Sequence, residues 1–340
     1  MLDSVREAAG NVAQRWLFGG LADRRPMPST VIDRGRTRAV HAFDVPGARQ
    51  GDPVLLVPPL AVSDSCFDLR RGCSLVEHLV TAGRPTYSVS YGEIRSDDRD
   101  LGLEHWVDDV LPAALGAVHD HCGGRPVHLV GWCLGGILTA LTAARHADGP
   151  IASLTVLGSP FDFTAIPLLT ALRPLDTATG RLAFPLLYRA FGGVPAPLVR
   201  RAFQISALDK HLTKPFAIAR NLTDRDYLAQ LEAVDGFTTG MLAFPGRAMD
   251  QVYRRFFRAN ALADGVVILA DTRIDVSTID VPTLVVAGAG DTIAPPRSAR
   301  RLQDLVPHAE FVTVPGGHLG VLTGRAARET TWPLIDRFHA

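Results

Sequence analysis

Short apolar runs alternate with longer amphipathic segments along most of the chain, which is typical of a mostly parallel central sheet with helices on both faces. The predicted strands span residues 39–45, 53–57, 85–91, 126–131, 151–158, 282–288 and 310–315. Helices are expected at residues 74–82, 104–121, 134–146, 297–305 and 326–338. The pattern therefore predicts the α/β fold class.

A long segment, residues 163–278, interrupts this alternation. It is rich in Leu, Ala, Phe and Arg, contains several prolines and has no strand rhythm, so we expect a helical insertion. An insertion at this point lies over the carboxyl edge of the sheet, where open α/β folds bind ligands. We therefore predict an N-terminal helix and linker at residues 1–35, a core of residues 36–162 and 279–340, and a helical cap at residues 163–278.

The N-terminal residues show a helical period of apolar positions. Val5, Ala9, Val12 and Trp16 recur at three- and four-residue spacing and predict an amphipathic helix at residues 3–18. A single apolar stripe usually faces a core, so we expect this helix to pack on the main domain. An interfacial role is the alternative.

Charge and hydropathy exclude several classes of function. Lys plus Arg and Asp plus Glu both total 35, so no excess charge draws the chain to nucleic acid. No run of about 18 apolar residues predicts a transmembrane segment, and the N-terminus lacks the apolar core of a signal peptide. A cytoplasmic location is therefore the expectation.

The cysteines and glycines give no sign of a disulfide framework, a metal or a cofactor. The four cysteines form no C-x-x-C pair. The glycines of "GAGD", residues 288–291, have the wrong length and context for a dinucleotide site, and the sequence shows no cluster of metal ligands. We therefore expect neither a metal nor a cofactor.

One strand-to-helix junction has the pattern of a nucleophile elbow. Gly131-Trp132-Cys133-Leu134-Gly135 follows a predicted strand and opens a predicted helix, the context in which a G-x-nucleophile-x-G pattern is informative. Glycines at the flanking positions let the strand and the helix approach closely. The helix N-terminus also favours a thiolate over a thiol. Cys133 is the candidate nucleophile, and an inert buried thiol is the alternative.

A base and an orienting acid follow in the expected chain order. His318 lies just after a predicted strand and two glycines, and Asp291 follows the strand "TLVVAGAG". The order Cys133, Asp291, His318 is that of the α/β-hydrolase triad. Other carboxylates remain alternatives: Asp162, Asp264 and Asp271.

The reaction also needs donors for an oxyanion hole. The N–H of Leu134, directly after the nucleophile, is the first expected donor. The second comes from the loop "LLVPPLAVS", in which Pro58 and Pro59 carry no N–H. Leu60 is therefore the first competent donor of that loop, and Ala61 is the next.

Several segments together resemble the polyhydroxyalkanoate (poly-3-hydroxybutyrate) synthase-like family of the α/β-hydrolase superfamily. "VPPLAVSDSCFDLRRGCSLVEHLVTAGRPTYSVSYG" is similar to its early strands and Pro-Pro loop, and "GWCLGG" to its cysteine-containing lipase-like box. "VPTLVVAGAGDTIAPPRSA" and "GGHLGVLTGRAARETTWPLIDRF" are similar to its acid and histidine segments. The cap and residues 60–66 depart from the family pattern. The resemblance implies an α/β-hydrolase fold with Cys133, Asp291 and His318 as its triad.

The same resemblance implies an acyltransferase that takes an acyl group, 3-hydroxyacyl in the family, from a CoA thioester and passes it to a hydroxyl acceptor. A thiol suits this role because acyl-cysteine is again a thioester and stays activated. The expected partners are an acyl-CoA or ester substrate, together with a second copy of the chain or a second synthase subunit, as in the shorter synthases. The resemblance also places the chain at the surface of polyester or lipid inclusions.

Two other classes of function remain open on these residues. Fold and triad do not fix the acceptor, so an esterase, lipase or thioesterase that uses the same cysteine is one alternative. A non-enzymatic binding protein with an idle triad is the other. Two interpretations are open for a group of five arginines, which either bind CoA phosphates or form a solvated face. They are Arg70, Arg71, Arg297, Arg300 and Arg301.

Overall fold

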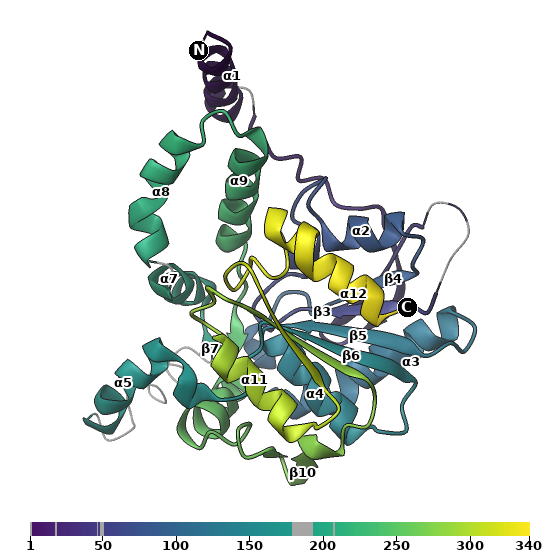
Figure 1. Ribbon diagram of the computed structural model, residues 1–340. Helices are drawn as coiled ribbons and strands as arrows, with labels where there is room; N and C mark the ends of the chain where they lie inside the picture. The colour runs from purple at the N-terminus through teal and green to yellow at the C-terminus, as the bar shows by residue number, and fades with distance from the viewer. Residues whose placement is uncertain (1, 18, 46, 48–50, 179–192, 207) are drawn as a thin grey trace.

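The computed structural model describes residues 2–17, 19–45, 47, 51–178, 193–206 and 208–340. Its centre is an eight-stranded sheet of order β1-β2-β4-β3-β5-β6-β11-β12, drawn in Figure 1. The pairs from β4 to β12 are all parallel, whereas β2 runs antiparallel to β1 and to β4. The predicted mostly parallel α/β sheet is therefore confirmed.

The seven predicted strands all form, each within two residues of its expected ends. The strands of the main sheet are β1 (Ser29–Gly35), β2 (Arg38–Phe43), β3 (Val54–Val57), β4 (Thr86–Ser90), β5 (Val127–Trp132), β6 (Ile151–Leu157), β11 (Thr283–Gly288) and β12 (Glu310–Val314). Two short ribbons lie outside it: β7 (Gly193–Val194) with β8 (Phe244–Pro245), and β9 (Val266–Leu269) with β10 (Thr272–Asp275).

The predicted helices of the core also form. They are α2 (Leu75–Thr81), the π-helical turn η3 (His105–Val110) that continues into α3 (Leu111–His121), α4 (Leu134–Arg145), α11 (Pro296–Leu305), and η7 (Ala327–Thr331) with α12 (Trp332–Phe338). Short 3-10 turns are η1 (Asp64–Phe67), η2 (Ser96–Asp98), η4 (Phe163–Ala165) and η6 (Val276–Thr278).

Two apolar clusters, one on each face of the sheet, hold these layers together. Successive residues of β3 alternate between them: Leu55 belongs to the cluster with α3, α4 and α11, and Leu56 to the cluster with α2 and α12. Both side chains have no exposed surface. A strand buried on both faces accounts for the continuous apolar run "VLLV", because successive side chains point to opposite faces of a sheet.

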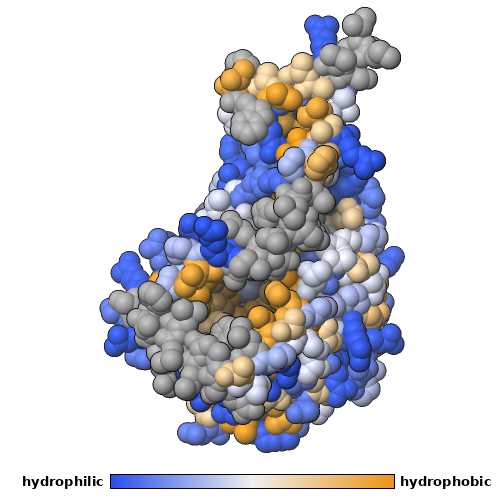
Figure 2. Space-filling view, turned by 90° about the vertical axis from the view of Figure 1, so that its left-hand side faces the viewer, coloured by the Kyte–Doolittle hydropathy of each residue, from blue (hydrophilic) through white to orange (hydrophobic). Residues whose placement is uncertain are grey.

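The helices of the cap gather beside one end of the sheet (Figure 1). Its described helices are α5 (Pro167–Ala178), α7 (Ala196–Ser206), α8 (Leu208–Arg220), α9 (Arg225–Thr239), α10 (Gly246–Gln251) and the π-helical segment η5 (Val252–Arg258). Residues 179–192 and 207 of the predicted cap lie outside the described residues. On the side formed by these helices the surface is hollowed, with apolar atoms in the hollow (Figure 2).

Two boundaries differ from the prediction. Residues 1–35 were expected to be only a helix and a linker, yet β1 (Ser29–Gly35) pairs with β2 and extends the sheet. Residues 163–278 were expected to be wholly helical, yet β9 and β10 form an antiparallel hairpin next to η6. Edge strands and short hairpins bury few side chains, so their apolar alternation is weak in the sequence.

The N-terminal helix α1 (Leu2–Leu17) forms as predicted but packs elsewhere. Its Asn11 side-chain amide donates to the carbonyl of Leu222, which lies between α8 and α9. The Leu21 N–H beyond the helix donates to Glu232 of α9. The helix therefore contacts the cap, and it projects from the molecule in Figure 1.

Within the residues that the structure describes, no helix has the length and apolarity that a membrane span requires.

Candidate active site

Cys133 occupies a strained turn between β5 and α4. Its backbone has φ 57° and ψ −126°, a conformation that side-chain-bearing residues rarely adopt. Its N–H donates to the carbonyl of Leu157 at the end of β6, at 2.9 Å, which fixes the turn against the neighbouring strand. The nucleophile elbow predicted from the sequence is therefore present in the structure.

Glycines on both sides of Cys133 make this turn sterically feasible. A Cβ on Gly131 would lie 2.5 Å from the Cα of Gly136, and a Cβ on Gly135 would lie 2.3 Å from the carbonyl oxygen of Val57. Real Cβ atoms do not approach backbone atoms so closely. Gly131 and Gly135 are therefore required by the close approach of α4 to β5 and β3.

His318 and Asp291 form a buried pair at the same edge of the sheet. The Nδ1 atom of His318 lies 2.9 Å from Oδ2 of Asp291, and the two side chains are 8% and 0% exposed. The other carboxylate oxygen accepts the N–H groups of Ile293 and Ala294, both at 2.8 Å. Asp291 is therefore held rigidly, with one oxygen directed at the imidazole.

Electrostatics link this pair to Cys133. Burial by itself lowers the pKa of His318, but the nearby Cys133 thiolate and the Asp291 carboxylate outweigh burial and raise that pKa. Burial by itself raises the pKa of Asp291, and its hydrogen bond with His318 lowers the pKa below the ordinary value. The site therefore favours the charged forms of His318 and Asp291 over their neutral forms.

The Nε2 atom of His318 is available for proton transfer. It is buried and makes no hydrogen bond within the described part of the chain. Because Asp291 occupies Nδ1, a neutral imidazole would carry its proton on Nδ1 and present a lone pair at Nε2. Nε2 is therefore suited to take the proton of the Cys133 thiol.

Trp132 holds the loop that carries His318, a contact that sequence reasoning did not find. Its indole N–H donates to the backbone carbonyl of His318 at 3.1 Å, and the two rings are 5.1 Å apart. The indole has no exposed surface and also contacts Phe237 of α9. The signal in the sequence was a Trp inside the elbow motif, since a buried indole N–H needs an acceptor.

The two predicted oxyanion donors lie on segments in close contact. Leu134 is the first residue of α4, where N–H groups have no partner within the helix. The Pro-Pro loop is adjacent, because a Cβ on Gly135 would lie 2.7 Å from the carbonyl oxygen of Pro58. Tyr91 donates its hydroxyl to that same oxygen at 3.0 Å and anchors the loop. Leu60 is buried in this loop, and its role as donor stays a prediction.

The alternative acids lie elsewhere. Asp162 begins η4, where its carboxylate accepts hydrogen bonds from Thr164 and Asn260. Asp264 and Asp271 are exposed near the β9–β10 hairpin. Among the candidate carboxylates, the hydrogen bond to His318 belongs to Asp291.

Most of the arginines considered for phosphate binding have protein partners. Arg70 has a side chain only 7% exposed and pairs with Asp226 at 2.6 Å. Arg71 pairs with Asp68 at 2.7 Å, Arg301 donates to the carbonyl of Ala263, and Arg300 lies over the ring of Phe311. Arg297 is exposed at the start of α11. These contacts argue against a shared phosphate site at those positions.

The other three cysteines differ from Cys133 in their surroundings. Cys66, Cys73 and Cys122 are buried, whereas Cys133 is partly accessible. Burial raises the pKa of Cys66, and the charge of Asp64 raises it further. Among the described residues, no group of three or more His, Cys, Asp or Glu side chains is placed to hold a metal ion.

Comparison with known proteins identifies similar chains. Residues 35–325 match the family described as alpha/beta hydrolase fold. The poly(3-hydroxyalkanoate) polymerase subunit PhaC of Allochromatium vinosum is 24% identical, over 99% of this chain and 95% of that protein. Proteins of the same name from Haloarcula marismortui and Haloferax mediterranei are each 22% identical, over 92% and 91% of this chain. The chain spans 67% and 63% of the length of those two relatives.

A solved structure of similar fold is the meta-cleavage product hydrolase of Pseudomonas fluorescens IP01. It is 17% identical, covers 92% of this chain and 97% of its own, and superimposes with a TM-score of 0.52. At this identity the likeness concerns the fold alone.

Proposed function

Because the chain belongs to the alpha/beta hydrolase fold family, we propose that it is an acyltransferase which moves an acyl group from a coenzyme A thioester to a hydroxyl acceptor. Its named relatives are poly(3-hydroxyalkanoate) polymerases, so 3-hydroxyacyl groups are the proposed substrates. The observation that carries the proposal is the elbow cysteine beside a buried His318–Asp291 pair.

In the first half-reaction, Cys133 is the nucleophile and His318 the general base. The thiol proton passes to Nε2 of His318, and the thiolate attacks the carbonyl carbon of the thioester. The N–H groups of Leu134 and Leu60 stabilise the oxyanion. The bond to the coenzyme A sulfur then breaks, and that sulfur takes the proton from His318. The products are acyl-Cys133 and free coenzyme A.

In the second half-reaction, a hydroxyl group attacks the acyl-cysteine. His318 accepts the hydroxyl proton, the bond between the acyl carbon and Cys133 breaks, and the thiol is restored by that proton. An ester replaces a thioester, so the step is downhill. A serine at this position would already hold an oxygen ester, from which transfer to another alcohol gains little. The thiol therefore favours onward transfer.

Asp291 is the orienting residue in this scheme. Its hydrogen bond fixes the imidazole with Nε2 directed away from the carboxylate, and its charge stabilises the imidazolium that forms in each half-reaction. Because the carboxylate accepts two further N–H groups, it does not compete for the proton.

We place the protein at the surface of polyester inclusions. The cap exposes large apolar side chains on three helices: Leu168 of α5, Leu198 of α7 and Phe216 of α8, which is 73% exposed. Such side chains suit contact with an insoluble apolar product. A second copy of the chain or a second synthase subunit is a further proposed partner.

Incubation of the purified chain with 3-hydroxybutyryl-CoA tests the function. Acyl transfer predicts release of coenzyme A together with growing insoluble polyester. Release of stoichiometric free 3-hydroxybutyrate without oligomers would overturn the transferase proposal and identify a hydrolase with the same triad. Absence of any coenzyme A release, with Cys133 as unreactive as the buried thiols, would identify a non-enzymatic protein.

A further inference from the structure

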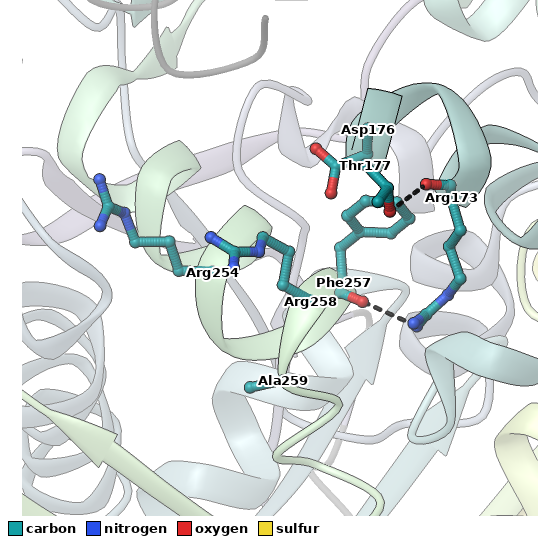
Figure 3. A pocket seen from close by; sticks show the side chains of 7 residues that line it. All are labelled: Arg173, Asp176, Thr177, Arg254, Phe257, Arg258 and Ala259. Atoms are coloured by element: carbon teal, nitrogen blue, oxygen red, sulfur yellow. Dashed lines mark hydrogen bonds between the residues drawn. The ribbon is translucent and has the colours of Figure 1, made fainter. Parts of the chain in front are cut away.

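A pocket of about 380 Å³ lies at the base of the cap, between α5 and η5, and the triad chemistry does not use it. Three arginines line it: Arg173 of α5, and Arg254 and Arg258 of η5 (Figure 3). Its volume falls in the range of small-molecule sites, about 300–1,000 Å³. A pocket with three guanidinium groups selects for an anion.

The positive charges of the pocket exceed the negative ones among its described residues. Asp176 is a lining carboxylate, but it is buried and accepts the hydroxyl of Tyr253. The Nε of Arg254 donates to Asp250 at 2.7 Å, and its two terminal nitrogens remain as donors for a ligand. Within the described part of the chain no carboxylate lies within ion-pair distance of Arg258. The pocket therefore has cationic donors to offer to a ligand.

Arg173 is preorganised at the opposite wall. Its Nη2 donates to the carbonyl of Phe257 at 2.8 Å, and its guanidinium lies 5.3 Å from the centre of the Phe257 ring. Its Nε is buried and makes no hydrogen bond within the described residues. The sticks in Figure 3 show Arg173 and Arg258 on opposite sides of Phe257. A buried donor without an acceptor is costly, and an anion in the pocket would supply one.

The pocket adjoins the exit of β6, the strand next to the nucleophile strand β5. The N–H of Phe163, in η4 just after β6, donates to the side chain of Asn260 at 2.8 Å, which ties η5 to that exit. Arg173 lies six residues into α5, which is about 9 Å along a helix that starts at Pro167. The phosphates of a coenzyme A thioester are separated from the reacting carbonyl by the long pantetheine arm. A phosphate site that shares no lining residue with the triad suits such a substrate.

We propose that Arg173, Arg254 and Arg258 bind the phosphorylated nucleotide end of the acyl donor. This assignment rests on the proposed function, since it supposes a coenzyme A thioester as donor. It replaces the arginines first considered in the sequence: Arg70 and Arg71 are paired with Asp226 and Asp68, whereas the three arginines proposed here line one pocket.

The test compares Arg254→Gln/Arg258→Gln with Arg255→Gln. Arg255 is an exposed arginine of the same helix that does not line the pocket, so it controls for the loss of an arginine elsewhere on η5. Binding of coenzyme A and of adenosine 3′,5′-bisphosphate is measured by calorimetry. We expect at least tenfold weaker binding of both probes to the double variant, and unchanged binding to the control. Unchanged binding to the double variant, or equal loss in the control, would overturn the site.

Kinetics provide a second readout. The ratio of kcat/KM for 3-hydroxybutyryl-CoA to that for 3-hydroxybutyryl-pantetheine, which lacks the phosphates, is expected to fall at least tenfold in the double variant. It stays at the wild-type value in Arg255→Gln. If the wild-type chain does not turn over coenzyme A thioesters, the proposed function fails, and adenosine 3′,5′-bisphosphate binding still decides the pocket.

Discussion

The indole N–H of Trp132 donates to the backbone carbonyl of His318 at 3.1 Å, so the residue before Cys133 holds the loop that carries His318. We expect Trp132→Phe to lower kcat by about tenfold, because loss of one buried hydrogen bond of about 1 kcal/mol lets the His318 loop move. Steady-state kinetics across pH would show the change in kcat and a shifted ionisation of the base.

Trp106→Phe is the matched control for that variant. Trp106 is equally buried, but its indole N–H makes no hydrogen bond within the described residues. Both variants lose similar packing, so only Trp132→Phe is expected to alter the pH profile. Equal effects of the two variants on kcat would show that Trp132 acts through packing alone.

Cys133 is expected to react with iodoacetamide at neutral pH at least tenfold faster than the other cysteines. It is partly accessible and lies beside His318, whereas Cys66, Cys73 and Cys122 are buried. Peptide mapping by mass spectrometry measures the four rates. Cys133→Ser should abolish polymer formation and leave residual ester hydrolysis at most. Polymerisation by the serine variant would refute the thioester argument.

Asp291→Asn is expected to lower kcat by about 10³–10⁴-fold, since an amide favours the wrong tautomer of the imidazole. The same substitution at Asp162 is the comparison, because Asp162 begins η4 and Asn is also a good N-cap residue. Activity of Asp162→Asn near the wild-type value, with an unchanged Tm, supports the assignment. A larger loss at Asp162 than at Asp291 would reverse the choice of acid.

Gly135→Ala is expected to destabilise the protein by about 3 kcal/mol or to prevent folding, because the added Cβ would lie 2.3 Å from the Val57 carbonyl oxygen. Gly116→Ala in α3 is the control, since a Cβ there has no neighbour within 4 Å. Urea unfolding should show Gly116→Ala to be more stable than wild type by up to about 1 kcal/mol. A tolerated Gly135→Ala would contradict the close approach of α4 to the Pro-Pro loop.

Acid is expected to destabilise the fold through two stacked histidines. The rings of His128 and His339 lie 4.1 Å apart, and burial lowers the pKa of His128 to about 4 and that of His339 to about 2. An unfolded chain takes up these protons below about pH 6.5. Stability is therefore full above that pH and falls as pH drops toward 4.

The size of this effect is about 1–2 kcal/mol per imidazole at pH 5. Urea unfolding at pH 7 and pH 5 measures it, and His339→Phe should reduce the difference between the two values. His308→Gln is the control, because His308 is exposed and does not belong to the stacked pair. The same loss of stability in wild type and His339→Phe would assign the effect to other groups.

The three residues of the proposed triad could be selected from the sequence because each carries a local signal. Cys133 lies between glycines at a strand-to-helix junction, Asp291 follows the buried strand β11, and His318 follows the edge strand β12 and two glycines. The chain order then selects one triad geometry, and the structure brings His318 and Asp291 together. The α/β class could also be predicted from the sequence, since strands such as β3 and β11 are buried on both faces and appear as unbroken apolar runs.

Contacts between segments distant in the chain could not be predicted from local sequence patterns. Nothing local to Arg173, Arg254 or Arg258 shows that they line one pocket, because α5 and η5 are separated by most of the cap. The sequence also suggested phosphate binding by Arg70, but Arg70 is buried against Asp226 of α9. A side chain's charge is a property of the sequence, whereas its partner depends on packing.

The sequence by itself determined the order of strands and helices along the chain and the position of the elbow at Cys133, because hydrophobic period and glycine placement act over a few residues. Tertiary structure alone decided that β1 joins the sheet, that α1 packs on the cap, and that the indole of Trp132 reaches the His318 loop. Each of these depends on which surfaces remain to be buried once the sheet has formed, and that is settled by the whole chain at once.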